Sequence, residues 1–206
     1  MKRSDPVRRP GRPLSFDRDA ALRNAMLTFW RYGYESTSVA DLTAAMGVST
    51  PSLYTAFGDK KQLFLEAARL YAGDSQTLSA AVFAASTAHV AAHELMTAAA
   101  VAYTGVDTPR GCLLASATAS GSAESADVQR AVADIRRDVQ QCLKDRIELD
   151  VQNGMLPSDT DAAGLSGLVM AVMQGMSVLT RDGTDQADLL AIVRVAMQSW
   201  PRQSVA

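Results

Sequence analysis

The sequence predicts an all-α protein in which a small N-terminal helical unit precedes a larger helical unit. Apolar residues recur at three- and four-residue spacings along most of the chain, and no convincing run of period-two alternation indicates a sheet. The alanine-rich stretch 80–102 has high helix propensity. Of the 206 residues, 48% are hydrophobic and 20% are charged, which is typical of a globular chain and excludes disorder throughout.

The N-terminal part is predicted to contain a basic flexible arm followed by four helices. Residues 1–13 hold three prolines and a glycine, so they can neither continue a helix nor bury apolar area. Helices are expected over 17–32, 38–46, 50–57 and 60–71, with glycines at their ends and Ser, Thr or Asp at their starts. The predicted domains are the arm 1–13, a three-helix unit 14–58, a linker helix 59–72 and a helical domain 73–206.

The larger domain is expected to contain helices over 76–103, 111–118, 123–151, 160–179 and 185–200, separated by Gly, Pro and Asn turn signals. The most apolar stretch, 165–179, is interrupted by polar residues and glycines and falls short of a membrane span. No apolar segment of a signal peptide follows the first residues. We therefore expect no transmembrane helix and a cytoplasmic location.

The charge is divided unevenly along the chain. The formal net charge is −2, but residues 1–72 carry 11 basic and 7 acidic residues, which is +4, and the remainder carries −6. Five of the first twelve residues are basic. This asymmetry indicates that the N-terminal part meets a polyanion and the C-terminal part does not.

Residues 38–57 have the pattern of a helix-turn-helix motif, with the tight turn at Gly47. Leu42, Ala45 and Val48 are expected to face the core, where Leu53 and Phe57 meet them. The exposed face of the second helix then carries small or aromatic polar side chains suited to base edges and phosphates in a major groove, namely Thr50, Ser52, Tyr54 and Thr55.

Residues 11–72 closely resemble the N-terminal domain of the TetR family of bacterial transcriptional regulators. The resemblance lies in Gly11-Arg12-Pro13, Ala25, Phe29, Gly33-Tyr34, Thr37-Ser38, Leu42, Met46-Gly47-Val48, Pro51-Ser52-Leu53-Tyr54, Phe57-Gly58-Asp59-Lys60 and Leu63-Phe64. It implies a three-helix DNA-binding domain, a fourth helix that links it to a variable all-α domain, a small-molecule effector bound by that domain, and a homodimer.

The resemblance implies DNA-contacting roles for particular residues. Thr50, Pro51, Ser52, Tyr54 and Thr55 would lie on the recognition helix, and the hydroxyl of Tyr54 and the ammonium of Lys60 would contact phosphate. Hydroxyls or backbone N–H groups at a helix start would also meet phosphate, at Thr37 and Ser38. The arm would reach the backbone or a minor groove through Arg8, Arg9 and Arg12. The recognition helix has no Arg, Lys, Asn or Gln, so sequence preference would depend on hydroxyls, methyl contacts and DNA shape.

Two C-terminal helices carry a candidate dimer interface. Gly167, Ala171 and Gly175 recur at four-residue spacing and allow close backbone approach, with Leu168 and Val172 beside them. The following helix has an apolar stripe that includes Leu189, Val193 and Met197. We expect these helices to form a four-helix interface with a second copy. The alternative is that they close the core of one protomer.

Three residues are candidates for ligand binding: His89, His93 and Cys112. The two histidines lie four apart and share a helix face, and a polar wall for a ligand is favoured over a metal pair because no third ligand is identifiable. Cys112 lies near a predicted helix start beside Arg110, as a redox or electrophile sensor would, although a buried small hydrophobe is the favoured interpretation. No metal or cofactor is predicted.

The predicted function is a ligand-responsive transcriptional regulator, in most such proteins a repressor, that binds a palindromic DNA operator as a homodimer and is released by a small-molecule effector. One alternative is control by modification of Cys112, and another is DNA binding without an effector. An enzyme is not expected, because the sequence has no recognisable nucleophile–base pair, metal-ligand set or glycine-rich phosphate loop.

Overall fold

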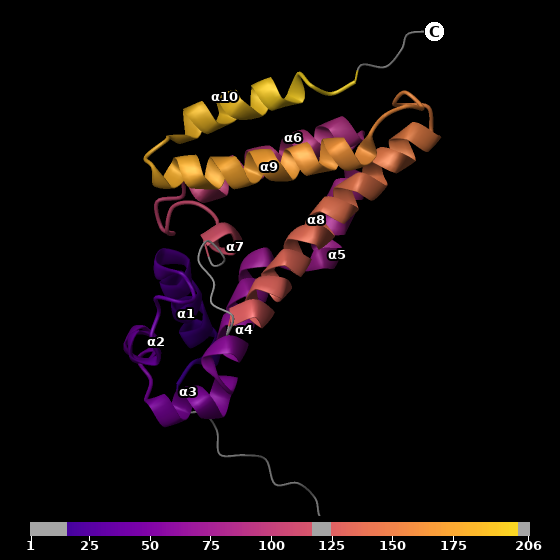
Figure 1. Ribbon diagram of the computed structural model, residues 1–206. Coiled ribbons are helices and arrows are strands. Elements are labelled where there is room, and N and C mark those ends of the chain that lie inside the picture. The colour runs from indigo at the N-terminus through magenta and orange to yellow at the C-terminus, as the bar shows by residue number, and fades with distance from the viewer. Residues whose placement is uncertain (1–15, 117–124, 202–206) are drawn as a thin grey trace, which may run out of the picture.

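The computed structural model describes residues 16–116 and 125–201, and every regular element within them is a helix. The helices form a small N-terminal group joined by α4 to a larger group, and α8 runs diagonally along the molecule (Figure 1). Their bounds are α1 Arg18–Tyr32, α2 Val39–Met46, α3 Thr50–Phe57, α4 Lys60–Ala72, α5 Ser75–Ala84, α6 Ala88–Tyr103, α7 Leu113–Ser116, α8 Ala126–Gln152, α9 Ala162–Arg181 and α10 Gln186–Met197. The predicted all-α fold is confirmed.

Side-chain caps explain where the N-terminal helices begin. The carboxylate of Asp17 accepts hydrogen bonds at the start of α1, and Asp59 caps α4 by accepting from the Gln62 N–H at 2.7 Å. Ser38 and Asp41 form a reciprocal capping box at the start of α2. Gly47 ends α2 in the left-handed region at φ 67°, which allows the tight turn into α3.

Aromatic and aliphatic side chains from α1, α3 and α4 pack in the N-terminal core. Phe29 and Phe64 are fully buried and meet edge to face with their ring centroids 5.1 Å apart. The guanidinium of Arg18 donates to the Ala56 carbonyl and, at 2.6 Å, to the Glu66 carboxylate, which ties the end of α3 to α1 and α4. Leu42, Leu53 and Phe57 are buried as predicted. Ala45 is exposed instead, and Met46 takes the inward position on α2.

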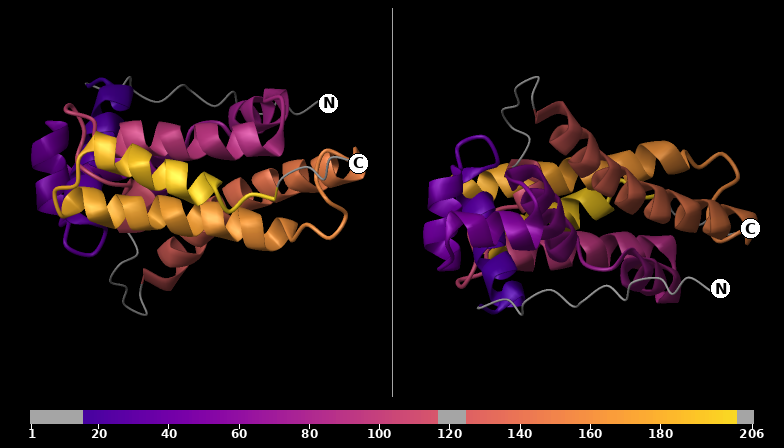
Figure 2. Two further views of the ribbon diagram at one scale, coloured as in Figure 1. Left: turned by 90° about the horizontal axis from the view of Figure 1, so that it is seen from above. Right: turned by 90° about the horizontal axis from the view of Figure 1, so that it is seen from below.

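The larger group of helices is layered. The views along the molecule show α6, α9 and α10 running side by side with α8 crossing them (Figure 2), and α6 contacts α8, α9 and α10. The predicted single helix over 76–103 is wrong, because the chain bends between α5 and α6. Ala85 has an extended ψ of 146°, and Thr87 caps α6 by accepting from the Val90 N–H.

A buried ion pair on α8 stabilises that bend. The guanidinium of Arg146 donates to three carbonyls at the end of α5, and the carboxylate of Asp150 accepts from the Ala88 N–H at 2.6 Å. The two side chains also pair with each other at 3.1 Å, and both residues are almost fully buried. The pair therefore satisfies the backbone groups that the two interrupted helix ends leave without helical partners.

The helices α7 and α9 differ from their predicted lengths. α7 is a single turn, whereas 111–118 was predicted and residues 117–118 lie outside the described ranges. α9 has 20 residues, and in the part of the chain that the structure describes it is the one helix long and apolar enough to cross a membrane by length and composition, with a mean hydropathy of 1.6. It packs against α6, α8 and α10 in this structure.

The contacts that join the N-terminal helices to the larger group include a surface ion pair and a buried hydrogen bond. Lys61 at the start of α4 forms an ion pair with Asp127 at the start of α8. The indole N–H of Trp30 in α1 donates to the Gly111 carbonyl at 3.1 Å, in the segment just before α7, and this bond is buried. The position of α1 is therefore linked directly to the interior of the larger group.

Candidate nucleic-acid interface and effector cavity

The outer face of α3 presents the side chains predicted for the recognition helix. Leu53 and Phe57 anchor its inner face, with exposed fractions of 0% and 3%. α3 lies at the end of the molecule opposite α9 and α10 (Figure 1). Thr50, Pro51, Tyr54 and Thr55 are exposed, and Ser52 is half-buried.

Two of the hydroxyls on this face, those of Ser52 and Thr55, already form local hydrogen bonds. The Thr55 hydroxyl donates to the Pro51 carbonyl at 2.8 Å. The hydroxyls of Ser49 and Ser52 are hydrogen-bonded to each other, also at 2.8 Å. Because a hydroxyl oxygen can still accept a hydrogen bond while its proton is donated, Ser52 and Thr55 would act toward DNA as acceptors, and the exposed Thr55 also offers its methyl group. Such a surface favours contacts with thymine methyls and phosphates over bidentate base recognition.

The start of α2 differs from the prediction at one residue. Thr37 has an exposed fraction of 1%, and its hydroxyl donates to the Gly33 carbonyl at 2.6 Å, so that hydroxyl is turned away from any phosphate. Its role is to hold the turn between α1 and α2. Ser38 is exposed, and its hydroxyl caps α2. A phosphate at this helix start would be met by backbone N–H groups.

Lys60 lies at the junction of α3 and α4 with its ammonium 4.5 Å from the centre of the Tyr34 ring. Partial burial lowers the pKa of this ammonium, and the nearby Glu35 carboxylate acts in the opposite direction. Burial raises the pKa of Tyr34, with smaller contributions from Glu35 and Asp59. The Tyr34 ring therefore supports the charged end of Lys60 by a cation–π contact. This role of Tyr34 was not predicted, because no local pattern in the sequence places residue 34 against residue 60.

Arg12 and its neighbours Arg8 and Arg9 lie outside the described residues, so their predicted DNA contacts stay predictions.

A cavity of about 290 Å³ opens among the helices of the larger group, next to α4. Most of its lining is aliphatic, contributed by Leu78, Leu95, Ala98, Ala99, Leu114, Ile135, Val139, Met170 and Met173. Its polar lining comes from Tyr71, Tyr103, Cys112, Arg136 and Gln174. A mostly apolar cavity with a few convergent polar groups is the usual form of a small-molecule site.

Two tyrosines surround Cys112 at one side of this cavity. The hydroxyls of Tyr71 in α4 and Tyr103 at the end of α6 both interact with the Cys112 thiol. Burial is the main cause that raises the pKa of each tyrosine, and the adjacent thiol raises it further. Cys112 has an exposed fraction of 5%, as its favoured interpretation as a buried small residue predicted. Neither tyrosine was predicted, since nothing in the sequence places residues 71, 103 and 112 together.

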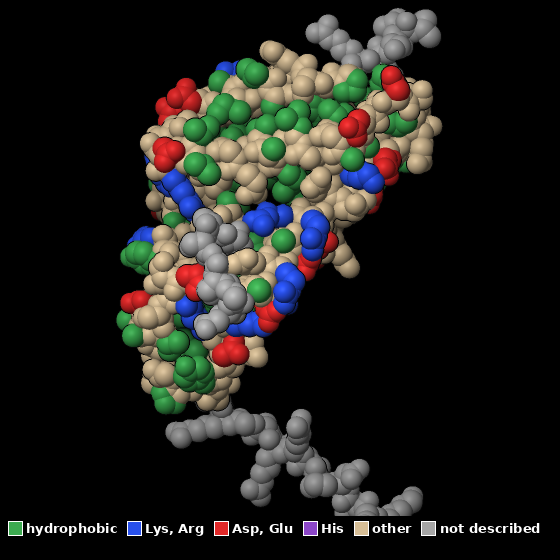
Figure 3. Space-filling view, in the orientation of Figure 1, with side chains coloured by type: hydrophobic (Ala, Val, Ile, Leu, Met, Phe, Trp, Pro, Cys, Tyr) green, Lys and Arg blue, Asp and Glu red, His purple; other side chains and the backbone are tan. Residues whose placement is uncertain are grey.

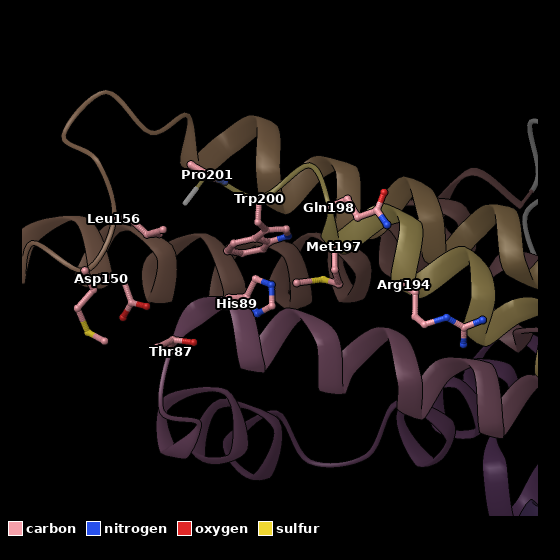
Figure 4. Close-up of a pocket in the computed structure, with 10 residues that line it drawn as sticks. Thr87, His89, Asp150, Leu156, Arg194, Met197, Gln198, Trp200 and Pro201 are labelled. Atoms are coloured by element: carbon pink, nitrogen blue, oxygen red, sulfur yellow. The ribbon is translucent and has the colours of Figure 1, made fainter. Parts of the chain in front are cut away.

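His89 and His93 do not join this cavity. His89 lies at the start of α6, in a different cavity of about 510 Å³ that is also lined by Asp150, Arg194 and Trp200 (Figure 4). Its ring meets the Trp200 ring edge on, 5.7 Å apart. Burial and the neighbouring His93 lower the pKa of His89. Along α6 the nearest lining residues of the two cavities, His89 and Leu95, are six residues apart, which is about 9 Å of helix.

His93 is exposed and lines neither of these cavities. Within residues 16–116 and 125–201, no group of three or more His, Cys, Asp or Glu side chains could hold a metal ion.

One face of α9 is exposed and almost free of charge. Leu168 is 39% exposed and Val178 is 57% exposed, and Gly164, Ala171 and Gly175 complete a stripe with alternating spacings of four and three residues. Gly167 and Val172 are half-buried beside it. Figure 3 shows hydrophobic side chains spread over the face that α9 and α10 present, with acidic side chains at its margins.

The predicted interface residues on α10 need correction. Leu189, Val193 and Met197 have exposed fractions of 0%, 1% and 8%, because this side of α10 packs against α6 and α9 of the same protomer. They close the protomer core, which was the alternative interpretation. The exposed side of α10 carries Val195, which is 64% exposed, and Arg194.

Comparison with known proteins identifies both parts of the chain. Residues 21–67 match the family model described as bacterial regulatory proteins, tetR family, and residues 91–196 match the tetracyclin repressor-like C-terminal domain. The chain is 32% identical over 193 residues to the HTH-type transcriptional repressor ComR of Escherichia coli K12, covering 93% of this chain and 92% of that protein. The HTH-type transcriptional repressor BdcR of the same organism is 41% identical over 64 residues, which is 31% of this chain and 32% of BdcR.

Solved structures agree with this result. A cysteine mutant of the TetR family transcriptional regulator CifR, complexed with 26-base-pair double-strand operator DNA, is 37% identical with a TM-score of 0.87, covering 93% of this chain and all of that one. A TetR transcriptional regulator from Rhodococcus sp. RHA1 is 33% identical with a TM-score of 0.60, over 88% of this chain and 98% of that one. With both domains matched, the chain belongs to the TetR family of bacterial DNA-binding transcriptional regulators and is not an enzyme.

Proposed function

We propose that this chain is a cytoplasmic repressor that binds a palindromic operator as a homodimer and leaves it when a small molecule occupies the cavity beside α4. The observation that carries the proposal is the position of α4. Its first residue, Lys60, adjoins the recognition helix, and Tyr71 near its end lines the cavity. The names of ComR and BdcR as repressors and the operator complex of CifR support the DNA-binding part of the proposal.

The DNA-facing surface consists of the outer face of α3 and the ends of its two neighbouring helices. Lys60 would supply a positive charge to a phosphate, and Tyr54, which is 48% exposed, would supply its hydroxyl. The N-terminal 72 residues carry a net +4 and the remainder −6, so the charge distribution favours the orientation in which α3 meets the DNA.

A homodimer would use the exposed stripe on α9. Leu168, Ala171 and Gly175 follow a spacing that stays on one side of the helix, and the small residues allow a second helix to approach closely. A two-fold axis through this face would present two copies of α3 to two half-sites about 34 Å apart. On α10 the proposed interface residues are the exposed Val195 and Arg194. They replace the buried stripe of Leu189, Val193 and Met197.

Coupling between cavity and DNA would pass through α4 and α1 together. Tyr71 lines the cavity, and its ring lies 4.8 Å from the ring of Trp30, edge to face. The indole N–H of Trp30 also donates a hydrogen bond to the carbonyl of Gly111, which precedes the cavity residue Cys112. A ligand that favours a different position of Tyr71 by about 1–3 kcal/mol would weaken DNA binding by roughly 5- to 150-fold.

DNA binding through α3 can be tested with purified protein and duplexes selected by it from a random pool. We expect the Thr50→Ala/Thr55→Ala variant to lose sequence preference while remaining folded and dimeric, because these methyls and hydroxyls lie on the exposed face. Thr77→Ala on α5 is the matched control, since it is also an exposed threonine near a helix start. Equal sequence preference in all three proteins would contradict the assignment of α3.

The dimer face can be tested by sedimentation with two matched charge substitutions. Leu168→Glu on α9 is expected to yield monomers, because it buries a carboxylate in the proposed interface. Phe83→Glu on α5 replaces a side chain that is 43% exposed, similar to Leu168, and should leave the dimer intact. A dimeric Leu168→Glu protein would contradict this interface.

The alternatives remain distinguishable. The burial of Cys112 favours a noncovalent ligand over modification of the thiol, since access is needed for reaction. If modification of Cys112 controlled DNA binding, thiol-reactive compounds would release the wild-type protein from DNA. The Cys112→Ser variant would stay bound to DNA under the same treatment. A protein whose DNA affinity responds to neither small molecules nor oxidants would be an effector-independent DNA-binding protein.

A further inference from the structure

The polar side of the cavity beside α4 has an excess of hydrogen-bond donors. The hydroxyls of Tyr71 and Tyr103 both meet the Cys112 thiol, and the Leu113 backbone N–H interacts with the Tyr71 hydroxyl. Sulfur is a weak hydrogen-bond acceptor, whereas a phenolic O–H is a good donor. Because burial raises the pKa of both phenols, both keep their protons at neutral pH. Two strong donors therefore share one weak acceptor.

The remainder of the wall favours an apolar and uncharged occupant. Its aliphatic side chains come from the six helices α4 to α9. Arg136 is the one charged side chain among the described lining residues, and its guanidinium donates to the Leu114 carbonyl at 3.0 Å. A cation would lie beside this guanidinium without a carboxylate in the described wall to balance it, which makes a cationic ligand unfavourable.

A second cavity of about 400 Å³ adjoins the first and is lined in part by the α4–α5 turn. The two share Ala72, Leu78, Ile135 and Val139, so these side chains form the partition between them. Arg69 and Asp138 lie on the outer side of this partition. The charged groups Arg69, Asp74 and Asp138 therefore line the second cavity, whereas Arg136 is the one charged side chain among the described lining residues of the first.

We propose that the cavity beside α4 binds an uncharged, mostly apolar molecule about the size of one substituted ring. An oxygen of this molecule would accept hydrogen bonds from the hydroxyls of Tyr71 and Tyr103 in place of the Cys112 thiol. Its volume of about 290 Å³ is at the lower end of small-molecule sites, which limits the size. This inference rests on the proposed function only in taking that molecule to be the effector.

The test compares two probes of nearly equal shape, methyl cyclohexyl ketone and isopropenylcyclohexane, by calorimetry on the full-length dimer without DNA. The ketone should bind about tenfold more tightly than the alkene, because it accepts the two hydrogen bonds and the alkene accepts neither. In Tyr71→Phe/Tyr103→Phe this preference should fall to within about twofold. Tyr32→Phe, which changes an exposed tyrosine of α1, should retain it. Melting temperatures establish that each variant is folded.

Trp30 reports where the probe binds. The chain has two tryptophans, so in the Trp200→Phe variant all tryptophan emission comes from Trp30, whose ring packs on Tyr71. Ketone binding should change that emission with the same Kd as calorimetry. The inference is overturned if the ketone does not bind up to its solubility limit, if the alkene or 1-cyclohexylethylamine binds equally well, or if the emission of Trp30 is unchanged.

DNA affinity measured with and without the ketone separates this inference from the proposed function. Ketone binding with the expected tyrosine dependence but with unchanged DNA affinity would refute the effector role and support the cavity chemistry. Release of DNA by the ketone in wild type and in Tyr71→Phe/Tyr103→Phe alike would support the regulator and refute the role of the tyrosine hydroxyls.

Discussion

Replacing Lys60 by methionine removes one positive charge from each protomer at the junction of α3 and α4. The methionine keeps an unbranched apolar side chain beside the Tyr34 ring, over which the lysine ammonium lies now, so local packing should survive. The charge is the element of the proposed interface whose effect on DNA binding can be calculated most simply, because each neutralised phosphate releases a fixed fraction of a counterion.

The magnitude follows from the number of contacts. Two copies of Lys60 in a dimer contribute about 1.8 to the slope of log K against log salt concentration, at about 0.9 per phosphate contact. Between 50 and 200 mM salt, wild-type protein should therefore lose about 12-fold more affinity than Lys60→Met. The variant should bind much more weakly at 50 mM salt, and its defect should shrink as salt rises.

Fluorescence anisotropy with a selected duplex, repeated across that salt range, measures both slopes. Lys144→Met is the matched control, because Lys144 is in the C-terminal half of α8 and pairs with Glu148 of the same helix at 3.1 Å. Its slope should equal that of wild type. A Lys60→Met slope that also equals the wild-type slope would refute the phosphate contact.

Three further substitutions test the fold around the cavity. Arg146→Met should destabilise the protein by about 3–5 kcal/mol in chemical denaturation, because it leaves the buried carboxylate of Asp150 without its partner; adding Asp150→Asn should recover part of this loss. Gly111→Ala should lower stability by about 1–3 kcal/mol, because its φ is 82° and a Cβ would lie 2.8 Å from the Ser177 carbonyl oxygen. His89→Gln should reduce the fall in melting temperature between pH 7.5 and pH 5.5, since the pKa of His89 is lowered in the folded protein and the unfolded chain binds the proton more readily as the pH falls.

Each of these has a matched control. Arg137→Met removes an exposed arginine from the same helix and should change stability little. Gly154→Ala also replaces a glycine with positive φ, at 70°, but nothing lies within 4 Å of its Cβ, so a loss equal to that of Gly111→Ala would contradict the predicted clash. His93→Gln should leave more of the acid sensitivity than His89→Gln, and the reverse order would contradict the assignment to His89.

Local signals explain why the N-terminal helices could be predicted closely. Ser38 and Asp41 form the capping box that their spacing indicated, and Pro51 lies in the first turn of α3. Thr37 was misjudged because the choice between a surface and a buried hydroxyl depends on the carbonyl of Gly33, four residues earlier, and on how α1 packs. A cap can be recognised from a few neighbouring residues, whereas burial cannot.

Long-range contacts explain the errors in the larger domain. The bend at Ala85 interrupts a stretch with high helix propensity, and the side chains that stabilise it, Arg146 and Asp150, lie about sixty residues later. The stripe of Leu189, Val193 and Met197 was identified correctly as apolar, but periodicity does not say whether α6 of the same chain or a second protomer covers it. The tyrosines around Cys112 were missed for the same reason.

The central claim, that α3 of two symmetry-related protomers reads DNA, is tested most directly by sequencing duplexes that the purified protein selects from a random pool. We predict an inverted repeat with half-site centres about one helical turn apart, which is the spacing that two recognition helices on a two-fold axis require. Enrichment of a single, non-palindromic site, or no enrichment above the starting pool, would contradict the claim.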